Sequence, residues 1–404
     1  MLTHGLRRAL TARIFLAVPL CFVIAVLATR VPAQAAGPGD EVRALWVRRA
    51  SLDSAEAIRK MVASAAAAGF NTLFVQAIDD SAAAAPPAFD PIGDTIAQAH
   101  AAGLRVHAWI DGARVAAPGE LPFGRTHVVY QHPEWLMVPR AIAAELIGID
   151  IHSPDYLGRL ARWTRANTDR VDGLYISPLQ PEATAHLAEV VRDFVRRYAI
   201  DGVYLDHVQF PTADFDYSAQ SIAAFRDFMR DQLPLAERQR IDDVEAIDPF
   251  AYPNELPEQW RLFRQSQLTA LIARLRTTVK ASRPAALVSA AVTSDATVAA
   301  RDNLQDWRTW LENGFLDALC PMASGDATLV SAQLAQVHAL AGDKPVWAGI
   351  GANRLSQRET LDDIGVARRA GAQGIILFSY DSLISPPKGI DYLSAIGRGA
   401  FAGS

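Results

Sequence analysis

The sequence predicts an α/β fold, a (β/α)₈ TIM barrel with long loops after its third and fourth strands. Two observations support this prediction. Short apolar runs alternate with longer segments in which apolar residues recur at helical spacing. Eight such runs occur, each followed by a helical segment, and eight units close a barrel. The alternative is an open doubly wound sheet, but no glycine-rich phosphate-binding sequence follows the first run.

Apolar, β-branched runs define the predicted strands. They cover residues 43–47, 71–77, 104–110, 202–205, 286–292, 316–321, 345–350 and 374–380. Helical spacing defines the predicted helices. They cover residues 54–68, 92–102, 182–198, 258–281, 303–313, 329–341, 359–370 and 391–396. Gly69 and Gly103 follow the first two helices directly, at the position where glycine commonly ends a helix.

Two long connections interrupt this alternation. Residues 111–181 follow the third strand and contain seven prolines, and residues 208–257 follow the fourth strand. Connections this long are usually functional in a compact domain. Barrels routinely exceed about 250 residues as one unit. Residues 41–400 are therefore expected to form a single barrel domain.

The first 35 residues are typical of a secretory signal peptide. Arg7, Arg8 and Arg13 precede an apolar run over residues 14–28, and Ala33-Gln34-Ala35 matches a small-residue cleavage site. The mature protein is then expected to be exported, to the periplasm or the medium, and to keep no stable membrane span. The alternative is an anchor that is not cleaved.

Composition narrows the classes of partner. Hydrophobic residues make up 50% and charged residues 21%, as in ordinary soluble globular proteins. Removal of residues 1–35, which hold four arginines and no acidic residue, moves the net charge from -5 to about -9. An acidic mature chain argues against nucleic acid as the partner and fits a neutral ligand such as a sugar. Cys320 would remain as a single thiol, and the oligomeric state stays open.

Asp206 is the strongest candidate for a catalytic residue. In barrels the active residues come from the carboxyl ends of the strands and the loops that follow them. Asp206 ends the fourth strand, and alternation places either Leu205 or Asp206 inside the barrel mouth. A carboxylate turned toward the helices would be a costly buried charge, so Asp206 is expected to face the cavity. The alternative is a structural aspartate that caps a loop or pairs with an arginine such as Arg114.

His107 and Trp109 share one face of the third strand, and Asp111 follows them. If that face lines the cavity, it offers the flat apolar surface and polar groups that a sugar requires. The alternative is a Trp109 packed in the core. Other polar or aromatic side chains near strand ends are expected to bind the substrate. They are Trp46, Gln76, Arg114, His207, Tyr380 and Asp381.

No cofactor or metal is predicted. His107, His207 and Asp111 could converge, but the sequence has no His-x-x-x-His or Cys-x-x-Cys spacing. A serine nucleophile is also unsupported, because no Gly-x-Ser-x-Gly sequence occurs. Cys320 lies within a predicted strand and is expected to be a buried packing thiol.

These sequences resemble the glycosyl-hydrolase-like family 10 group of secreted barrels. The resemblance begins at EVRALWV, GFNTLFVQA and GLRVHAWIDGAR and continues through HPEW (residues 132–135). YAIDGVYLDHVQFP (residues 198–211), with HAW, is the most specific part, and DWRTWLENGFLDALCPM and GIILFSYDSL complete it. It covers residues 41–385 and implies a TIM-barrel glycosidase.

The chain departs from the family pattern where the strands end. The family has Asp-Asp at the end of strand four, and here the second position is His207. The arginine expected after strand two is absent at Gln76-Ala77-Ile78, and the aromatic residues expected after Cys320-Pro321 are replaced around Ala323-Ser324. Asp111 stands where the family has Asn. We expect His207 either to orient the substrate or to replace the lost carboxylate.

The resulting hypothesis is hydrolysis of glycosidic bonds in a polysaccharide or peptidoglycan glycan by two carboxyl groups. Asp206 is one of them, and Asp111 is the first candidate for the other, as a general acid if it is desolvated beside Trp109. Asp80, Asp295 and Asp381 are further candidates for the second carboxyl. One alternative is a non-catalytic carbohydrate-binding barrel, and another is a metal-dependent hydrolase on the same scaffold.

Overall fold

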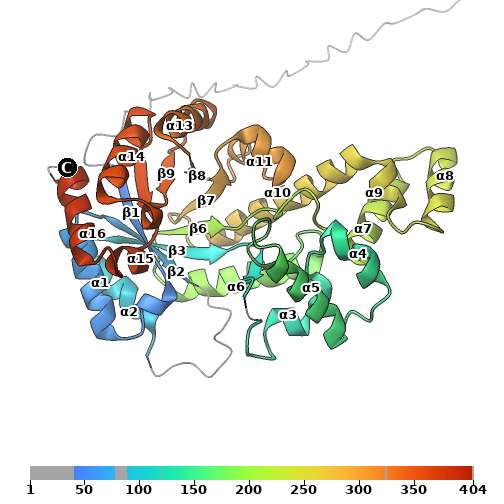
Figure 1. Cartoon of the computed structure of the whole chain (residues 1–404), viewed down its shortest axis with the longest axis horizontal. Coiled ribbons are helices and arrows are strands. Elements are labelled where there is room, and N and C mark those ends of the chain that lie inside the picture. The colour runs from blue at the N-terminus through green and yellow to red at the C-terminus, as the bar shows by residue number, and fades with distance from the viewer. Residues whose placement is uncertain (1–40, 78–88, 120, 324, 403–404) are drawn as a thin grey trace, which may run out of the picture. The chain divides into compact units, whose positions relative to one another are not determined.

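The computed structural model describes residues 41–77, 89–119, 121–323 and 325–402. Parallel strands form a closed barrel in the order β1-β10-β9-β8-β7-β6-β3-β2 (Figure 1). They are β1 (Val42–Val47), β2 (Thr72–Gln76), β3 (Arg105–Asp111), β6 (Gly202–Asp206), β7 (Leu287–Thr293), β8 (Ala318–Met322), β9 (Trp347–Ile350) and β10 (Gly374–Leu377). The predicted TIM-barrel fold is therefore confirmed.

Helices follow the strands and cover the outside of the barrel. They include α1 (Ala55–Ala67), α2 (Pro91–Ala101), α6 (Pro181–Arg197), α10 (Pro257–Ser282), α11 (Ala296–Asp302), α12 (Trp307–Glu312), α13 (Ala327–Ala341), α14 (Gln357–Arg369), α15 (Tyr380–Ile384) and α16 (Ile390–Ile396). Gly69 and Gly103 lie at φ 79° and 74°, as expected after α1 and α2. Within the described part of the chain, none of the helices is long and apolar enough to cross a bilayer.

Two predicted elements have different bounds. The helix predicted over residues 303–313 is the shorter α12, which begins at Trp307 because Asp306 caps it by accepting a hydrogen bond from Thr309 N at 3.3 Å, and α11, which precedes it, was not predicted. The last strand ends at Leu377 and not at Tyr380, which begins α15. Tyr380 is buried, and its pKa is raised by that burial, opposed by a hydrogen bond with Ser64 of α1. Its side chain therefore faces α1 and not the barrel mouth.

Alternation along the strands divides the core into two parts. Trp46, Phe74, Trp109 and Tyr204 belong to one buried cluster inside the barrel, with Trp347 from β9. Their neighbours along the strands belong to the larger cluster between the strands and the helices. These neighbours include Leu45, Leu73, Val75, Ala108, Ile110, Val203 and Leu205. Cys320 is a buried free thiol of the inner cluster, as predicted.

The connection after β3 is an ordered lobe and not the long loop that we expected. It contains β4 (Arg114–Ala116), α3 (Val128–Gln131), η2 (Pro133–Trp135), α4 (Arg140–Ile147), α5 (Pro154–Ala166) and β5 (Leu174–Tyr175). β4 and β5 pair antiparallel, and the lobe has its own apolar cluster, which includes Trp135 and Leu160. We call residues 114–176 the β4–β5 lobe. Its prolines break the periodicity, but its apolar residues suffice for a second core.

The connection after β6 is also largely helical. It forms α7 (Ala219–Arg230), α8 (Leu235–Glu245) and α9 (Ala251–Glu255) before α10 begins (Figure 1). Phe225 of α7, Tyr252 of α9 and Trp260 of α10 join the larger buried cluster. This connection therefore extends the outer layer and is not a free loop either.

Candidate active site

Two carboxylates meet at the mouth of the barrel. Asp111 ends β3 and Asp206 ends β6, and the two residues are register partners on neighbouring strands. Asp206 follows the inward-facing Tyr204 by two residues, and Asp111 follows the inward-facing Trp109 by two. The expected inward orientation of Asp206 is therefore confirmed. One oxygen of each carboxylate lies within 4.8 Å of the other.

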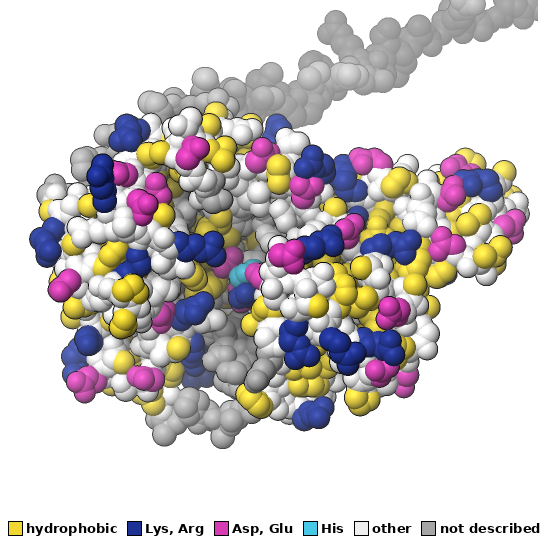
Figure 2. All heavy atoms as spheres, in the orientation of Figure 1, with side chains coloured by type: hydrophobic (Ala, Val, Ile, Leu, Met, Phe, Trp, Pro, Cys, Tyr) yellow, Lys and Arg dark blue, Asp and Glu magenta, His cyan; other side chains and the backbone are white. Residues whose placement is uncertain are grey.

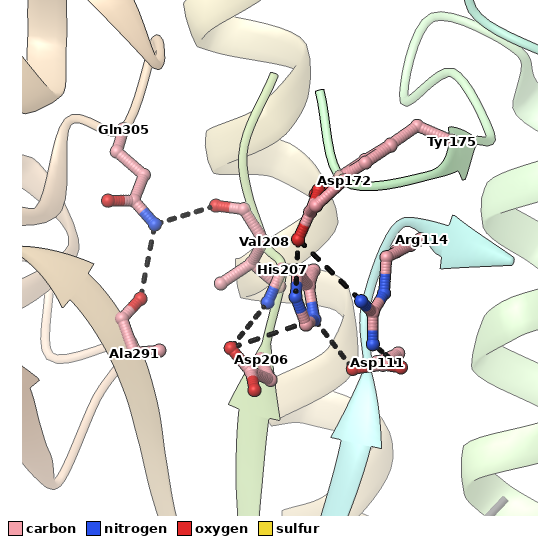
Figure 3. A network of polar contacts seen from close by, with 9 residues as sticks. All are labelled: Asp111, Arg114, Asp172, Tyr175, Asp206, His207, Val208, Ala291 and Gln305. Atoms are coloured by element: carbon pink, nitrogen blue, oxygen red, sulfur yellow. Dashed lines mark hydrogen bonds and ion pairs between the residues drawn. The ribbon is translucent and has the colours of Figure 1, made fainter. Parts of the chain in front are cut away.

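The backbone brings these strand ends unusually close together. Gly112 N donates a hydrogen bond to Asp206 O at 2.7 Å, and a Cβ on Gly112 would lie 2.3 Å from Cγ1 of Val208. Only glycine fits there without moving the backbone. Gln305 fixes the next residues, because its Nε2 donates to Val208 O and to Ala291 O, both at 3.1 Å (Figure 3). The turn after β6 is thus held from both sides.

His207 lies between carboxylates in this turn. Its Nδ1 is 2.7 Å from Oδ1 of Asp111 and its Nε2 is 3.2 Å from Oδ2 of Asp172, while Asp206 Oδ1 is 3.7 Å from Nδ1 (Figure 3). Only 16% of the side chain is exposed. Burial lowers the pKa of His207, but Asp206, Asp111 and Asp172 outweigh that effect and raise the pKa to about 10. His207 is therefore an imidazolium at neutral pH.

Arg114 is the second cation of the network. Its Nη2 donates to Oδ2 of Asp111 at 3.1 Å, and its Nη1 lies 3.6 Å from Oδ2 of Asp172. Tyr175 OH donates to Oδ1 of Asp172 at 2.6 Å. Arg114 thus pairs with Asp111 and Asp172, while Asp206 Oδ1 accepts a hydrogen bond from His207 N at 2.9 Å, a contact of the kind that the loop-capping alternative predicts.

The two carboxyl groups at the rim titrate differently. Burial raises the pKa of Asp206, and His207 opposes that shift only in part. Burial also acts to raise the pKa of Asp111, but hydrogen bonding and charge from His207, with Arg114, bring it below its ordinary value. Asp111 therefore ionises before Asp206. This reverses our expectation, which gave the acid role to Asp111.

Three residues of the site carry atoms of the kind that bind metal ions. Asp111, Asp206 and His207 each offer one ligand atom, all within 4.8 Å of one another. However, both ring nitrogens of a protonated His207 donate to carboxylates, and Arg114 already neutralises Asp111. Metal binding would have to remove the proton from a group with a pKa of about 10. These residues do not fit a metal centre.

Aromatic side chains lie beneath the rim. Phe378 follows β10, and its ring centroid is 5.3 Å from that of Trp46 and 6.4 Å from that of Trp109. Figure 2 shows that this face is hollowed, with a histidine and acidic side chains at the bottom of the hollow. A cavity of about 370 Å³ at the ends of β8 and β9 shares Phe378 and is also lined by Met322, Asn353 and Arg354.

Several residues expected to bind substrate have other positions. His107 is 2% exposed and stacks on Phe74 at a centroid distance of 5.1 Å, one layer below Trp109. Burial lowers the pKa of His107 to about 4, so it is a neutral core residue. Trp46 is also buried, at 1% exposed. Neither reaches the rim, which corrects the expectation that they contact a ligand.

Gln76 and Asp381 support the turn after β1. Gln76 Oε1 accepts a hydrogen bond from Arg49 N at 3.1 Å, and Asp381 accepts from Arg48 N at 3.2 Å and from Ser51 Oγ. Asp295, a further candidate for the second carboxyl, caps α11 by accepting from Thr297 N and Val298 N. The side chains of Gln76, Asp381 and Asp295 therefore each accept hydrogen bonds from nearby backbone N–H groups.

Two of our expectations fall on residues that the structure does not describe. Asp80, also a candidate for the second carboxyl, and the signal sequence over residues 1–35 lie outside the described residues. Asp172 and Tyr175, which come from the β4–β5 lobe, were not predicted as site residues. Phe378 was not predicted either, and its place at the end of an apolar strand was its only signal in the sequence.

The His207 network predicts a dependence of stability on pH. The pKa of His207 is raised from 6.5 to about 10, so its contribution is complete below pH 6.5 and is lost as pH rises to about 10. Its upper limit is about 5 kcal/mol. We expect the free energy of unfolding, from urea titrations at pH 6, 8 and 10, to fall less steeply in His207→Gln than in the wild type. The exposed His152→Gln should keep the wild-type slope, and equal slopes in all three proteins would contradict the ion pairing.

Comparison with known proteins gives the family. The sequence model of the family Glycosyl hydrolase-like 10 matches residues 41–339. The chain is 23% identical over 287 residues to Glycosyl hydrolase DigH of Escherichia coli K12 and of Shigella flexneri, a match that covers 63% of this chain and 54% of each relative. It thus spans about half the length of these curated relatives.

Solved glycosidases share the fold. The PgaB (BpsB) glycoside hydrolase domain from Bordetella bronchiseptica superimposes with a TM-score of 0.60 at 14% identity, over 90% of this chain and 100% of that one. The catalytic domain of beta-amylase from Paenibacillus polymyxa gives a TM-score of 0.59 at 12% identity, over 90% and 98%. The barrel is thus of a kind found in glycosidases, and the chain belongs to the glycosyl hydrolase-like 10 family.

Proposed function

We propose that this protein hydrolyses glycosidic bonds of a polysaccharide or a peptidoglycan glycan. The observation that carries the proposal is the pair of inward carboxylates, Asp111 and Asp206, at the ends of neighbouring barrel strands. Their pKa values are shifted in opposite directions, which is how an acid and an ionised carboxylate coexist in glycosidases. Membership of a glycoside-hydrolase-like family supports the same reaction.

In the first step Asp206 donates its proton to the glycosidic oxygen while Asp111 attacks the anomeric carbon. The bond from that carbon to the leaving oxygen breaks, and a glycosyl ester forms on Asp111. Asp206, now ionised, takes a proton from water, and the hydroxide formed releases the sugar from the ester. One oxygen of each carboxylate lies within 4.8 Å of the other, which leaves less room for an attacking water between them than the separation of about 6.5–9.5 Å in inverting enzymes.

The other residues of the network hold the ionised partner in place. His207 and Arg114 each donate to a different oxygen of Asp111, which keeps that carboxylate charged and oriented. The half-buried Phe378, which packs on the buried Trp109, supplies apolar surface for the C–H groups of a pyranose ring. The protein thus provides a proton donor, a fixed carboxylate and a flat apolar wall.

The proposal includes export of the protein to its substrate. The arginines, apolar run and cleavage site of residues 1–35 support export, as does an acidic mature chain. A glycan outside the cytoplasm would then be the accessible substrate. Sequencing the amino terminus of the protein from the culture medium or periplasm should give a start at residue 36.

Turnover of glycans by the purified protein tests the reaction. Peptidoglycan glycan strands, a neutral polysaccharide and an amino-sugar polymer are incubated separately, and new reducing ends are measured. We expect new reducing ends to appear from at least one of these substrates, and in the same amount with and without a chelator. Saturable binding without product over long incubation would replace the hydrolase with a carbohydrate-binding barrel, and loss of product in chelator would favour a metal-dependent reaction.

A further inference from the structure

Asp172 reaches the site from a part of the chain distant in sequence from the other rim residues. It lies in the turn between α5 and β5 of the β4–β5 lobe. Its Oδ2 lies 3.2 Å from Nε2 of His207, on the side of the ring opposite the nitrogen that meets Asp111 (Figure 3). The imidazole is therefore held at both nitrogens by two carboxylates from different elements.

The backbone around Asp172 is fixed against the strand that carries Arg114. Gly173 packs so tightly on β4 that a Cβ there would lie 2.1 Å from Ala116 O and 3.1 Å from Cδ of Arg114. Arg114 and Tyr175 are register partners, and Ile176 N donates to Ala113 O at 2.8 Å. Asp172 itself is 53% exposed, so its position depends on these contacts and not on burial.

We propose that Asp172 is a positioning residue of the active site, through which the β4–β5 lobe holds the His207 ring against the Asp111–Asp206 pair. This inference rests on the proposed function. His207 brings a positive charge to the Asp111–Asp206 pair, and the lobe supplies a further carboxylate that contacts this charge. Asp172 does not itself touch the reacting atoms.

The geometry explains why one partner is not enough. His207 adopts φ 49°, a left-handed conformation that is uncommon for a residue with a Cβ, and it follows the last residue of β6. With Asp111 alone the ring would have one anchor and could rotate away from it. With Asp172 it has two anchors on opposite sides, so the Nδ1–H stays directed at the oxygen of Asp111 that is not bonded to Arg114.

The titratable groups that face His207 come from several elements packed on it. They are Asp111 on β3, Arg114 on β4, Asp172 and Tyr175 at the end of the lobe, and Asp206 on its own strand. Three carboxyl groups therefore face two cations, and the ionised Asp111 and Asp172 contact the two ring nitrogens. Removal of Asp172 leaves one of these two contacts, which weakens the hold on the imidazolium proton.

The decisive experiment measures the titration of the His207 ring by NMR, without substrate, in the wild type and in Asp172→Asn. We expect the pKa of His207 to fall from about 10 toward 6.5, with a proton affinity at least roughly tenfold lower. Asp172→Glu should restore part of the affinity. Asp169→Asn, an exposed change three residues earlier in the same turn, should leave the titration unchanged.

Kinetics give the second readout on the substrate that the wild type hydrolyses. For Asp172→Asn we expect kcat at pH 8 to fall roughly 10- to 100-fold, with KM within about twofold, and a new decline of kcat as pH rises through the lowered pKa of His207. An unchanged His207 titration would overturn the inference, as would an unchanged kcat. A shifted titration in a protein that cleaves no glycan would instead sustain the positioning role and reject the proposed function.

Discussion

The Asp206→Asn variant is expected to lose about 10³-fold or more of kcat on any glycan that the wild type hydrolyses. An amide cannot donate the proton that the leaving oxygen requires. The change is nearly isosteric, and the buried Asp206 has a raised pKa, so its ionised form disfavours the folded state above the ordinary pKa. We therefore expect stability at pH 7 to hold or increase while activity is lost. Parallel measurements of kcat and urea unfolding check this separation.

Asp302→Asn is the matched control for this variant. Asp302 is the last residue of α11 and pairs with its neighbour Arg301. The Asp302→Asn variant should retain the kcat of the wild type. If Asp206→Asn kept more than about a tenth of wild-type kcat, proton donation by Asp206 would be contradicted.

The Asp111→Ala variant is expected to lose about 10³-fold or more of activity for a different reason. Here the group that forms the covalent bond is removed, and a space remains beside the cations His207 and Arg114. A small anion such as azide can occupy that space and attack the anomeric carbon. We expect azide to restore part of the turnover and to give a glycosyl azide of inverted configuration, detected by NMR of the products.

Azide should restore nothing to Asp206→Asn on a substrate with an unactivated leaving group, because that variant keeps its nucleophile and lacks its acid. This comparison separates the two roles. Wild-type activity in Asp111→Ala, or equal rescue of both variants, would contradict the assignment of nucleophile and acid.

The parts of the site that the sequence predicts depend on local periodicity. Alternation within the run GVYLD is enough to turn Asp206 inward, because Val203 and Leu205 must face the helices. The same reasoning places Trp109 inside the barrel and Asp111 above it. The eight strands follow from apolar runs for the same reason, since both faces of a barrel strand are buried.

The parts that sequence reasoning missed depend on contacts between distant segments. Nothing in the residues around Asp172 marks it, and its position follows from the packing of Gly173 against β4. We expected Tyr380 at the barrel mouth because we predicted that the last strand extends to this residue. The strand β10 ends three residues earlier, at Leu377, and Tyr380 begins α15, so its side chain lies on another side. The protonation states of Asp111 and Asp206 also depend on neighbours that only the fold brings together.

The fold explains how a charged histidine is accommodated at residue 207. An imidazolium at this position is stabilised because Asp111, Asp172 and Asp206 surround it. His207 and Arg114 in turn keep Asp111 ionised. His207 therefore adds a positive charge beside the two inward carboxylates.

The structure of Asp206→Asn with a bound short glycan tests the pairing of Asp206 and Asp111 most directly. We expect the glycosidic oxygen at about 3 Å from the side chain of residue 206, and an oxygen of Asp111 facing the anomeric carbon. A glycan bound only in the cavity at the ends of β8 and β9, with no sugar atom near either residue, would contradict catalysis by this pair.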